Sequence, residues 1–376
     1  MSTGLRNCSF LCLFKLCSWS WTCLFLNGGD KSKMASEVVI RRAQQSDYND
    51  VVYGIGDVFN GRDYLKTKYL ELLEDPDVLP FVAEMGDEIV GFYCGQLVDN
   101  RRTLVKRAGR VKEGYRGKGI FFMLNNTIEF EAAKEGTVMV GAMACKKDNA
   151  ERVSNGFAER KGFRLNIHLK VYSIKFERSK VPTVDPSTYQ NVHEMTLTEV
   201  EELFNDEVTW NRLLHHERIC VHYVPLRRVK ENIRHVINHR TKAFMSFGPS
   251  DVNDAGAPLD RKVQNATMLS TIHFFKTNLG LGFNSDFYGA DLQDLESHLQ
   301  MHFRHISEAE DATISWVVNI DVNLDSKVRE RLKQSLSAYG IQLTQNPNVQ
   351  EEYIFERRFS PPRASDERGT LNTHLP

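Results

Sequence analysis

The stretch GRVKEGYRGKGIFFML, residues 109–124, carries the clearest chemical signal in the chain. Arg116, Gly117, Lys118 and Gly119 form a turn between two apolar segments. Glycines let the backbone approach a ligand closely, and the first N–H groups of a helix lack partners and lie at its partly positive end. If a helix begins after Gly119, this turn can bind an anion, and phosphate is the first candidate.

Two common phosphate-binding loops do not fit this turn. A Walker loop has Lys and then Ser or Thr after its last glycine, whereas Gly119 is followed by Ile120 and Phe121. A dinucleotide-binding loop comes early in a repeating strand–helix–strand chain. This turn instead follows three strand-like runs that include a hairpin.

The segments before the turn predict the elements that hold it. Alternating apolar residues predict a strand at 37–43, and Ser46 is a candidate N-cap for a helix. A second helix is expected at 63–75, with Leu65, Tyr69 and Leu72 on one face. Gly86 and Asp87 separate two strand-like runs, which indicates a hairpin. A third run, residues 104–111, leads into the turn.

The segments after the turn continue this mixed pattern. Ile120, Leu124, Ile128 and Ala132 recur at helical spacing, so a helix is expected directly after the turn. Three further elements then follow in order: a buried strand at 137–145, a helix closed by Gly162, and a strand at 167–176. The first part of the chain is therefore predicted to be one α/β (α+β) domain with a mixed sheet flanked by helices.

The sequence YRGKGIF, placed between a strand and a helix, resembles the pyrophosphate loop of the GNAT superfamily of N-acetyltransferases. That loop has the pattern Arg/Gln-x-x-Gly-x-Gly/Ala. Arg116 and Gly119 match it, and Phe121 stands where Gly or Ala is usual. The resemblance implies acetyl-CoA as co-substrate. It also implies a set of cofactor-binding residues: Val111, Glu113, Arg116, Gly117, Lys118, Gly119, Ile120 and Phe121.

A closer resemblance covers most of the chain. The segments GRDYLKTKYLELLEDPDV, EMGDEIVGF and GFNSDFYGADLQDLESHLQMHFRHI are similar to the vertebrate histidine N-acetyltransferase group. This implies acetyl transfer to the amino group of a small amine, a free amino acid such as histidine. Two alternatives stay open: acetylation of a peptide N-terminus or a polyamine, and acyl-CoA binding without catalysis.

The sequence does not identify the catalytic residues. The superfamily often has a Glu base on the strand before the loop, but this strand has Arg107 instead. It often has a Tyr acid on a later helix, but Phe157 and Ala158 stand there. Possible substitutes are Glu84, Tyr93 and Glu113.

Two residues are candidates for acceptor binding. Asp63 and Tyr64 lie between the first two expected helices, where the superfamily frames its acceptor pocket. An Asp could hold a cationic amine, and a Tyr could stack on a ring. The alternative is that Asp63 caps the following helix and Tyr64 packs inward.

The second part of the chain predicts a related domain. Strand, helix, strand, helix and strand follow one another from FNSDFYG to EEYIFERRF, which suggests a degenerate internal repeat without the glycine turn. Residues 215–240 are expected to be largely helical and basic, and Thr198 with Glu201 forms a capping-box pattern. The expected divisions are an N-terminal extension at 1–33, the N-acetyltransferase domain at 34–178, a linker at 179–190, a smaller GNAT-like domain at 191–360, and a disordered tail at 361–376.

The composition describes an ordinary globular protein. The net charge is −1 and 26% of residues are charged, so nucleic acid is not an expected partner. Four of the seven cysteines lie in the first 23 residues, and Cys94, Cys145 and Cys220 are too scattered for a disulfide framework. A reducing compartment, the cytoplasm, is expected. Membrane contact is expected only if the apolar residues 8–26 act as an anchor.

Histidines one helical turn apart could form a metal pair. His235 with His239 and His298 with His302 have this spacing, but no third ligand accompanies either pair. We expect solvated helix faces and no metal.

Overall fold

The computed structural model describes residues 21–23, 38–56, 61–146, 162–181, 183–247, 258–289, 294–310, 313–323, 326–338, 340–341 and 349–359. The rest of the expected N-terminal extension and the expected C-terminal tail lie outside these residues. The helix expected before Gly162, with Phe157 and Ala158, also lies outside them.

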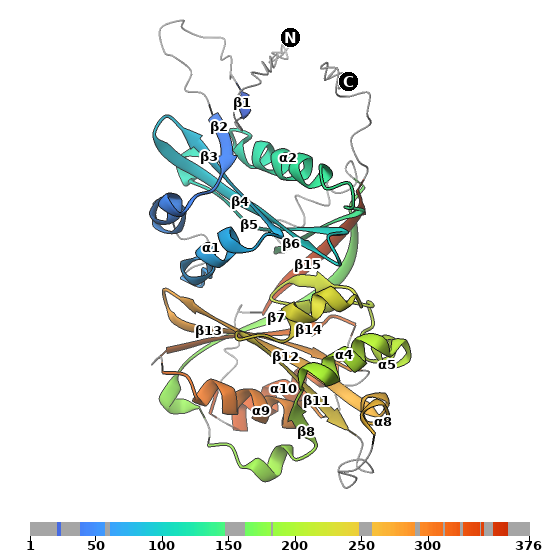
Figure 1. Ribbon diagram of the computed structural model, residues 1–376. Helices are drawn as coiled ribbons and strands as arrows, with labels where there is room; N and C mark the ends of the chain where they lie inside the picture. Colours follow the sequence, from blue (N-terminus) through green and yellow to red (C-terminus); the bar gives the residue numbers. More distant parts are fainter. Residues whose placement is uncertain are drawn as a thin grey trace, which may run out of the picture.

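Within the described residues, thirteen strands form one sheet that runs through the molecule (Figure 1). The order across this sheet is β1-β2-β3-β4-β5-β6-β15-β7-β14-β13-β12-β11-β8. A separate hairpin pairs β9 (Ile219–Val221) with β10 (Val224–Leu226). The strands of the large sheet are β1 (Trp21–Cys23), β2 (Val38–Arg42), β3 (Val78–Met85), β4 (Glu88–Val98), β5 (Thr103–Val111), β6 (Val140–Lys146), β7 (Arg164–Glu177), β8 (Val192–Glu194), β11 (Thr241–Phe247), β12 (Ala266–Thr277), β13 (Gly280–Tyr288), β14 (Thr313–Asp321) and β15 (Val349–Arg358).

Helices flank the sheet, as the sequence predicted. In the first half α2 packs on β3, β4 and β5, while α1 packs on both β3 and β12 and so contacts the two halves (Figure 1). The α-helices are α1 (Leu65–Glu74), α2 (Ile120–Ala133), α4 (Leu197–Asn205), α5 (Glu207–Leu213), α6 (Ile233–Val236), α8 (Leu259–Gln264), α9 (Leu295–Ser307) and α10 (Ser326–Ala338). Short 3-10 helices occur at Gln45–Asp47, Glu113–Tyr115, Arg178–Lys180, Pro186–Tyr189 and Lys230–Asn232, and a π-helix spans Asp50–Gly54.

The strand order is nearly mirrored about its centre. One half runs β2-β3-β4-β5-β6 and the other β8-β11-β12-β13-β14, with β15 and β7 between them. The final strand β15 pairs antiparallel with both β6 and β7. Two pairs, β5 with β6 and β13 with β14, are parallel. Each half therefore contains one parallel strand–helix–strand unit, and the C-terminal strand joins the halves.

The apolar periodicities of the first half are confirmed. Leu65, Tyr69 and Leu72 are the buried residues of α1, and Ile120 and Leu124 are among those of α2. The hairpin expected at Gly86 and Asp87 connects β3 to β4. These positions lie on the faces that their spacing predicted, because each faces the sheet.

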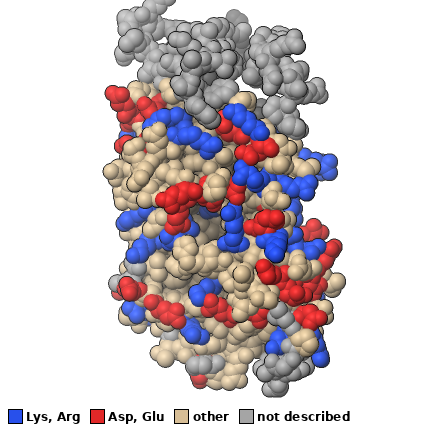
Figure 2. Space-filling view, in the orientation of Figure 1, with Lys and Arg blue, Asp and Glu red and all other residues tan. Residues whose placement is uncertain are grey.

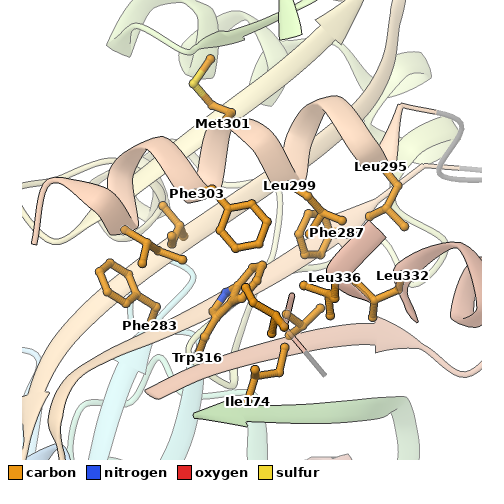
Figure 3. Close-up of a cluster of buried hydrophobic side chains, with 14 of the residues drawn as sticks. Ile174, Phe283, Phe287, Leu295, Leu299, Met301, Phe303, Trp316, Leu332 and Leu336 are labelled. Carbon is orange, nitrogen blue, oxygen red and sulfur yellow. The ribbon is translucent and has the colours of Figure 1, made fainter. Parts of the chain in front are cut away.

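The core of the second half lies between the sheet and α9 with α10 (Figure 3). Trp316 of β14 is fully buried, and its ring meets that of Phe303 edge-on at 5.2 Å between centroids. Leu299 of α9 and Leu336 of α10 belong to the same cluster. Burying side chains of this size supplies much of the stability of such a layer.

The prediction that residues 215–240 are largely helical was wrong. Residues Ile219 to Leu226 form the β9–β10 hairpin, and only α6 and a short 3-10 helix follow. The β-branched residues and Pro225 in this stretch favour an extended backbone over a helix. Strands β11 and β12 were also not expected from the sequence.

Two smaller expectations were also wrong. The capping box lies two residues earlier than expected, at Thr196 and Glu199, so α4 begins at Leu197. His298 and His302 are fully buried and not solvated. Ser270 on β12 takes the place of water, since it hydrogen-bonds Nδ1 of His298 at 2.7 Å and Nε2 of His302 at 2.9 Å.

Candidate active site

The glycine turn forms the N-terminal end of α2. After β5, the 3-10 turn at Glu113–Tyr115 leads to Arg116, and α2 starts directly after Gly119. Gly117 and Gly119 both have φ of +78°, a backbone conformation that residues with a Cβ rarely adopt. The helix expected after Gly119 is confirmed.

The two glycines before α2 have open space beside them as far as the described residues go. A Cβ at Gly117 or Gly119 would meet no described atom within 4 Å. Among the described residues, no capping side chain accepts from the first N–H groups of α2. These N–H groups lie at the positive end of the helix, a position that suits an anion.

The other residues predicted for this site lie around the turn in different ways. Arg116 is exposed, and its Nε donates to the carbonyl oxygen of Val111 at 3.1 Å. The Lys118 ammonium lies 4.8 Å from the centre of the Tyr115 ring. Glu113 is exposed. Ile120 is buried in the core, so only its backbone can face a ligand.

Strand β5 diverges from β6 beside this turn. Their parallel pairing runs from Thr103 with Val140 to Lys106 with Met143, whereas β5 continues to Val111. The N–H of Lys112 donates to Val90 of β4 at 2.9 Å. Because alternate residues of a strand direct their backbone groups to opposite sides, Gly109 and Val111 direct theirs to the open edge.

The backbone of β5 is irregular where the pairing with β6 ends. Ala108 has φ of +61°, and the register with β4 shifts between Phe92 and Cys94. A Cβ at Gly109 would lie 2.7 Å from the Phe121 ring and 2.9 Å from the Tyr93 ring. Glycine is therefore required at 109, and the bulge re-aims the last part of β5.

Phe121, which replaces the usual small residue, packs onto the sheet. Its ring lies 4.7 Å from that of Tyr93, with the two planes inclined by 31°. The ring thus covers Gly109 while 45% of the residue stays exposed. Burial raises the pKa of the Tyr93 hydroxyl, so this group stays protonated at neutral pH.

The other two candidates for proton transfer are placed differently from Tyr93. Glu84 lies on β3, and its Oε2 accepts from Nε of Arg41 at 2.6 Å. Glu113 lies in the exposed turn before Arg116. Of the three substitutes considered from the sequence, only Tyr93 is placed against Gly109 on the unpaired part of β5.

Asp63 and Tyr64, the predicted acceptor-binding residues, lie at the start of α1. The carboxylate of Asp63 pairs with both terminal nitrogens of the buried Arg110 and accepts from the N–H of Leu65 at 3.0 Å. Its polar contacts therefore hold α1 against β5. The ring of Tyr64 is half-buried and faces the second half of the molecule.

A residue that the sequence analysis did not select, His222, covers this part of β5. Nη2 of Arg107 lies 3.2 Å from Nδ1 of His222, and the Tyr64 ring meets the His222 ring edge-on at 4.7 Å. His222 stacks on His273 at 4.9 Å and on Phe275 at 4.8 Å. Burial, with the nearby positive charges, lowers the pKa of His222 well below its usual value, so its imidazole is neutral and Nδ1 accepts from Arg107.

His222 and Tyr223 form the two-residue turn of the β9–β10 hairpin. Both have positive φ, +49° and +65°. Such conformations cost about 1 to 2 kcal/mol for residues with side chains and persist only where surrounding contacts enforce them. The ring of His222 is thereby held against Arg107 of the other half.

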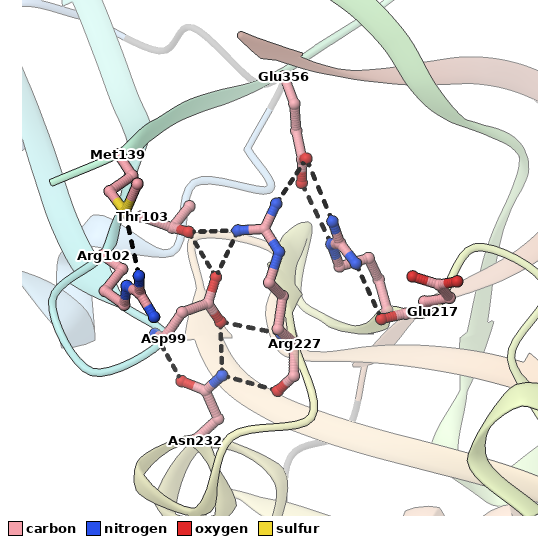
Figure 4. Close-up of polar contacts among 9 residues, drawn as sticks. Asp99, Arg102, Thr103, Met139, Glu217, Arg227, Asn232 and Glu356 are labelled. Atoms are coloured by element: carbon pink, nitrogen blue, oxygen red, sulfur yellow. Dashed lines mark hydrogen bonds and ion pairs between the residues drawn. The ribbon is translucent and has the colours of Figure 1, made fainter. Parts of the chain in front are cut away.

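A buried polar network anchors this hairpin to the first half (Figure 4). Asp99, in the turn between β4 and β5, accepts from Arg227 at 3.1 Å and from Asn232 at 2.6 Å. Arg227 also donates to Glu356 of β15 at 3.0 Å. A buried carboxylate with this many donors is well stabilised, so the network fixes the hairpin over β5.

The comparison with known families concerns this first half. Residues 42–163 match the family model described as Acetyltransferase (GNAT) family. This region is a GNAT acetyltransferase domain. The predicted enzyme class, an acetyl-CoA-dependent N-acetyltransferase, is thereby confirmed.

Solved structures similar to this chain include a tandem GNAT protein from the clavulanic acid biosynthesis pathway. It is 12% identical, covers 86% of this chain and 99% of its own, and has a TM-score of 0.49. A GCN5-related N-acetyltransferase from Sphaerobacter thermophilus is 11% identical, covers 86% and 96%, and has a TM-score of 0.48. The ribosomal-protein-S18-alanine N-acetyltransferase from Escherichia coli is 16% identical, covers 35% and 80%, and has a TM-score of 0.31. No curated protein matches this chain in sequence.

The residues of the GNAT domain fit acetyl-CoA as the co-substrate. The N–H groups at the start of α2, with Arg116 and Lys118 beside them, suit the pyrophosphate. The open edge of β5 at Gly109 and Val111 suits the amides of pantetheine, which can pair with it like an added strand. Acetyl-CoA supplies the activated acetyl group.

The remaining expectations concern metals and membranes. The described residues contain no group of three or more His, Cys, Asp or Glu side chains able to hold a metal ion. None of the helices that the structure describes has both the length and the apolar character needed to cross a membrane. Positive and negative side chains are interspersed over the face seen in Figure 2.

Proposed function

We propose that this N-acetyltransferase acts on a small amine, a free amino acid such as histidine. The observation that carries the proposal is the His222–Tyr223 turn, which lies over Arg107 from a point 115 residues further along the chain. The face of β5 opposite α2 is therefore covered by the second half of the molecule. A covered face favours a small acceptor over a protein surface.

The parts of the site have separate tasks in this proposal. The start of α2 binds the pyrophosphate, and the open edge of β5 aligns the thioester. A backbone N–H between Gly109 and Val111 donates to the thioester carbonyl as negative charge develops on its oxygen. The neutral amine nitrogen bonds to the acetyl carbon and the C–S bond breaks. The nitrogen gives up one proton to water, the thiolate gains one, and coenzyme A leaves as the free thiol.

Histidine is proposed as the acceptor because of the segments shared with the histidine N-acetyltransferase group. The two alternative functions make different demands on the site. A peptide N-terminus needs room for a chain beyond its first residue, and a polyamine needs carboxylates facing the acceptor. An acyl-CoA-binding protein needs only the loop and the strand edge.

One experiment separates these functions. Thiol release from acetyl-CoA by the purified full chain is measured with free amino acids, short peptides and spermidine. Release that depends on histidine, with N-acetylhistidine found by mass spectrometry, is the expected result. Release only with peptides or spermidine would contradict the proposed acceptor. Acetyl-CoA binding without release for any amine would contradict acetyl transfer.

The cytoplasm is the proposed location. Cys94, Cys145 and Cys220 are free thiols in the structure, and acetyl transfer draws on a soluble pool of acetyl-CoA. A reducing compartment agrees with both. Fractionation of cells that express the full chain, with residues 1–33 present or deleted, tests this location and any role of residues 8–26 in anchoring.

A further inference from the structure

Arg107 is a half-buried cation whose contacts are with uncharged groups. Its Nη1 donates to Oε1 of Gln96 at 2.8 Å, its Nη2 lies 3.2 Å from Nδ1 of His222, and its Cζ lies 5.3 Å from the centre of the Tyr64 ring. Among the residues that the structure describes, no carboxylate pairs with it. Guanidinium groups removed from water are normally paired with an anion.

The charges around Arg107 leave a positive surplus. Lys68 and Arg240 share one carboxylate, that of Glu71, and Arg110 pairs with Asp63. Within the described part of the chain, these three cations and the unpaired Arg107 therefore lie near only two carboxylates. Burial, together with Arg107 and Arg240, lowers the pKa of Lys68 despite its contact with Glu71. An anion bound here would relieve this repulsion, and a second cation such as a polyamine would increase it.

Arg107 also lies next to the unpaired part of β5, where the thioester is proposed to bind. It is the first residue after Lys106, where pairing with β6 ends, and it precedes the unpaired stretch at Gly109. Lys106 bonds Asn125 and Glu129 of α2. Since neighbouring side chains of a strand point to opposite faces, Arg107 points away from α2, to the face covered by His222.

We infer that Arg107 binds the carboxylate of the acceptor and so restricts the acceptors to free amino acids. The inference rests on the proposed N-acetyltransferase function and names the group that selects its substrate. A guanidinium binds a carboxylate through two parallel hydrogen bonds. His222 stabilises the geometry, because its Nδ1 accepts one N–H of Arg107 and its ring packs on Phe275. Arg107 is a specificity-determining residue in this scheme.

Three amines that differ at one group provide the test. L-histidine has a carboxylate, L-histidinamide has a neutral amide like a peptide N-terminus, and histamine has a hydrogen at that position. Steady-state thiol release gives kcat and KM for each amine. We expect the wild-type kcat/KM for histidine to exceed the other two by about 100-fold, which a bidentate charged contact accounts for.

Substitutions at Arg107 make the test specific. Arg107→Met should lower kcat/KM for histidine by about 100-fold, mainly through KM, and leave histamine and histidinamide within about threefold. Arg107→Lys should lower kcat/KM for histidine less than Arg107→Met does, because lysine keeps the positive charge but lacks the two parallel N–H donors of the guanidinium. Arg240→Met is the matched control, since it removes a cation that already has a carboxylate partner. Acetyl-CoA affinity and thermal unfolding are measured for every variant.

Each other outcome overturns the inference. Equal losses for all three amines would show that Arg107 only supports the fold or the hairpin. A wild-type preference for histamine or histidinamide would refute carboxylate recognition and leave acetyl transfer intact. If the wild type binds acetyl-CoA and acetylates no amine, the proposed function fails, and the inference fails with it.

Discussion

Each half of the molecule contains one strand–helix–strand unit with a parallel strand pair, and the two units differ in how far that pairing extends. In the first half the unit is β5–α2–β6, and in the second it is β13–α9–β14. The pairing of β5 with β6 stops at Lys106, but that of β13 with β14 continues from Leu281 to Asp286. Side chains reinforce the second pair, since Nδ2 of Asn319 donates to Asp286 at 2.9 Å. In the part of the chain that the structure describes, the first unit therefore leaves a longer strand edge open than the second.

The N-terminal ends of the helices in the two units, α2 and α9, also differ. α2 starts from Gly119, where a Cβ would meet no described atom within 4 Å, whereas α9 starts from Asp294. The Asp294 carboxylate accepts from Asn191 at 3.0 Å and from Ser246 at 2.9 Å. A carboxylate at this point opposes a bound phosphate. The first unit thus presents a helix start and a strand edge that suit acetyl-CoA, whereas the second packs around Trp316. The β9–β10 hairpin, which belongs to neither unit, covers the face of β5 opposite α2.

The largest expected effect comes from changing the turn before α2. Arg116→Glu combined with Gly119→Val should weaken acetyl-CoA binding by at least about 1000-fold. The charge at the pyrophosphate reverses, and valine is strained at φ of +78°. Isothermal titration calorimetry measures the Kd.

The matched change in the other unit is Asp294→Asn. It should leave the Kd for acetyl-CoA within about threefold, although it weakens contacts to Ser246 and Asn191. Unchanged affinity in the Arg116 and Gly119 variant, or an equal loss in the Asp294 variant, would remove the distinction between the two units.

A smaller effect, on the free energy of unfolding, is expected at Asp286, where β13 remains paired with β14. Burial raises the pKa of Asp286 to about 7, above the unfolded value of about 3.9. As pH rises between these values the unfolded carboxyl ionises first, so the free energy of unfolding falls and reaches its full loss above about pH 7. Asp286→Asn should therefore raise the free energy of unfolding by about 2 kcal/mol at about pH 8 and change it little near pH 4.

Asp321 on the neighbouring strand serves as the control for this pH effect. Although burial acts in the opposite direction, hydrogen bonds from His216 and Asn323 hold the pKa of Asp321 below its usual value. Asp321→Asn should lower stability at about pH 8, where Asp286→Asn raises it. Urea unfolding at several pH values measures both. The same pH profile for wild type and Asp286→Asn would show that this carboxyl does not carry the effect.

The smallest expected effect is at Phe121. Its ring packs on Tyr93 over Gly109, and the α2 backbone supplies the donors to the ligand. Phe121→Ala should change the Kd for acetyl-CoA by less than about threefold. A much larger loss would mean that the ring contacts the ligand directly, and a large gain would mean that it obstructs the turn.

The sequence predicted the elements whose signals are local. The apolar faces of α1 and α2 follow from helical spacing, the β3–β4 turn from Gly86 and Asp87, and the helix start from Gly119. Each of these features depends on residues within a few positions of one another. The glycine turn, and with it acetyl-CoA as the co-substrate, could be predicted from the sequence for the same reason.

The rest of the site depends on contacts that span the chain. His222 reaches Arg107 across 115 residues, and β15 inserts between β6 and β7 from the end of the chain. The hairpin that carries His222 is short, so its extended pattern was too brief to be told from a helix. The burial of His298 and His302 likewise depends on Ser270 and Ser285, which lie on other elements.

Hydrogen–deuterium exchange of the full chain, with and without acetyl-CoA, tests the central claim most directly. We expect acetyl-CoA to slow exchange of the backbone amides from Gly109 to Phe121 and to leave those from Asp294 to Leu299 unchanged. Unchanged exchange across residues 109–121 at saturating acetyl-CoA, or protection that appears at the start of α9 instead, would contradict it.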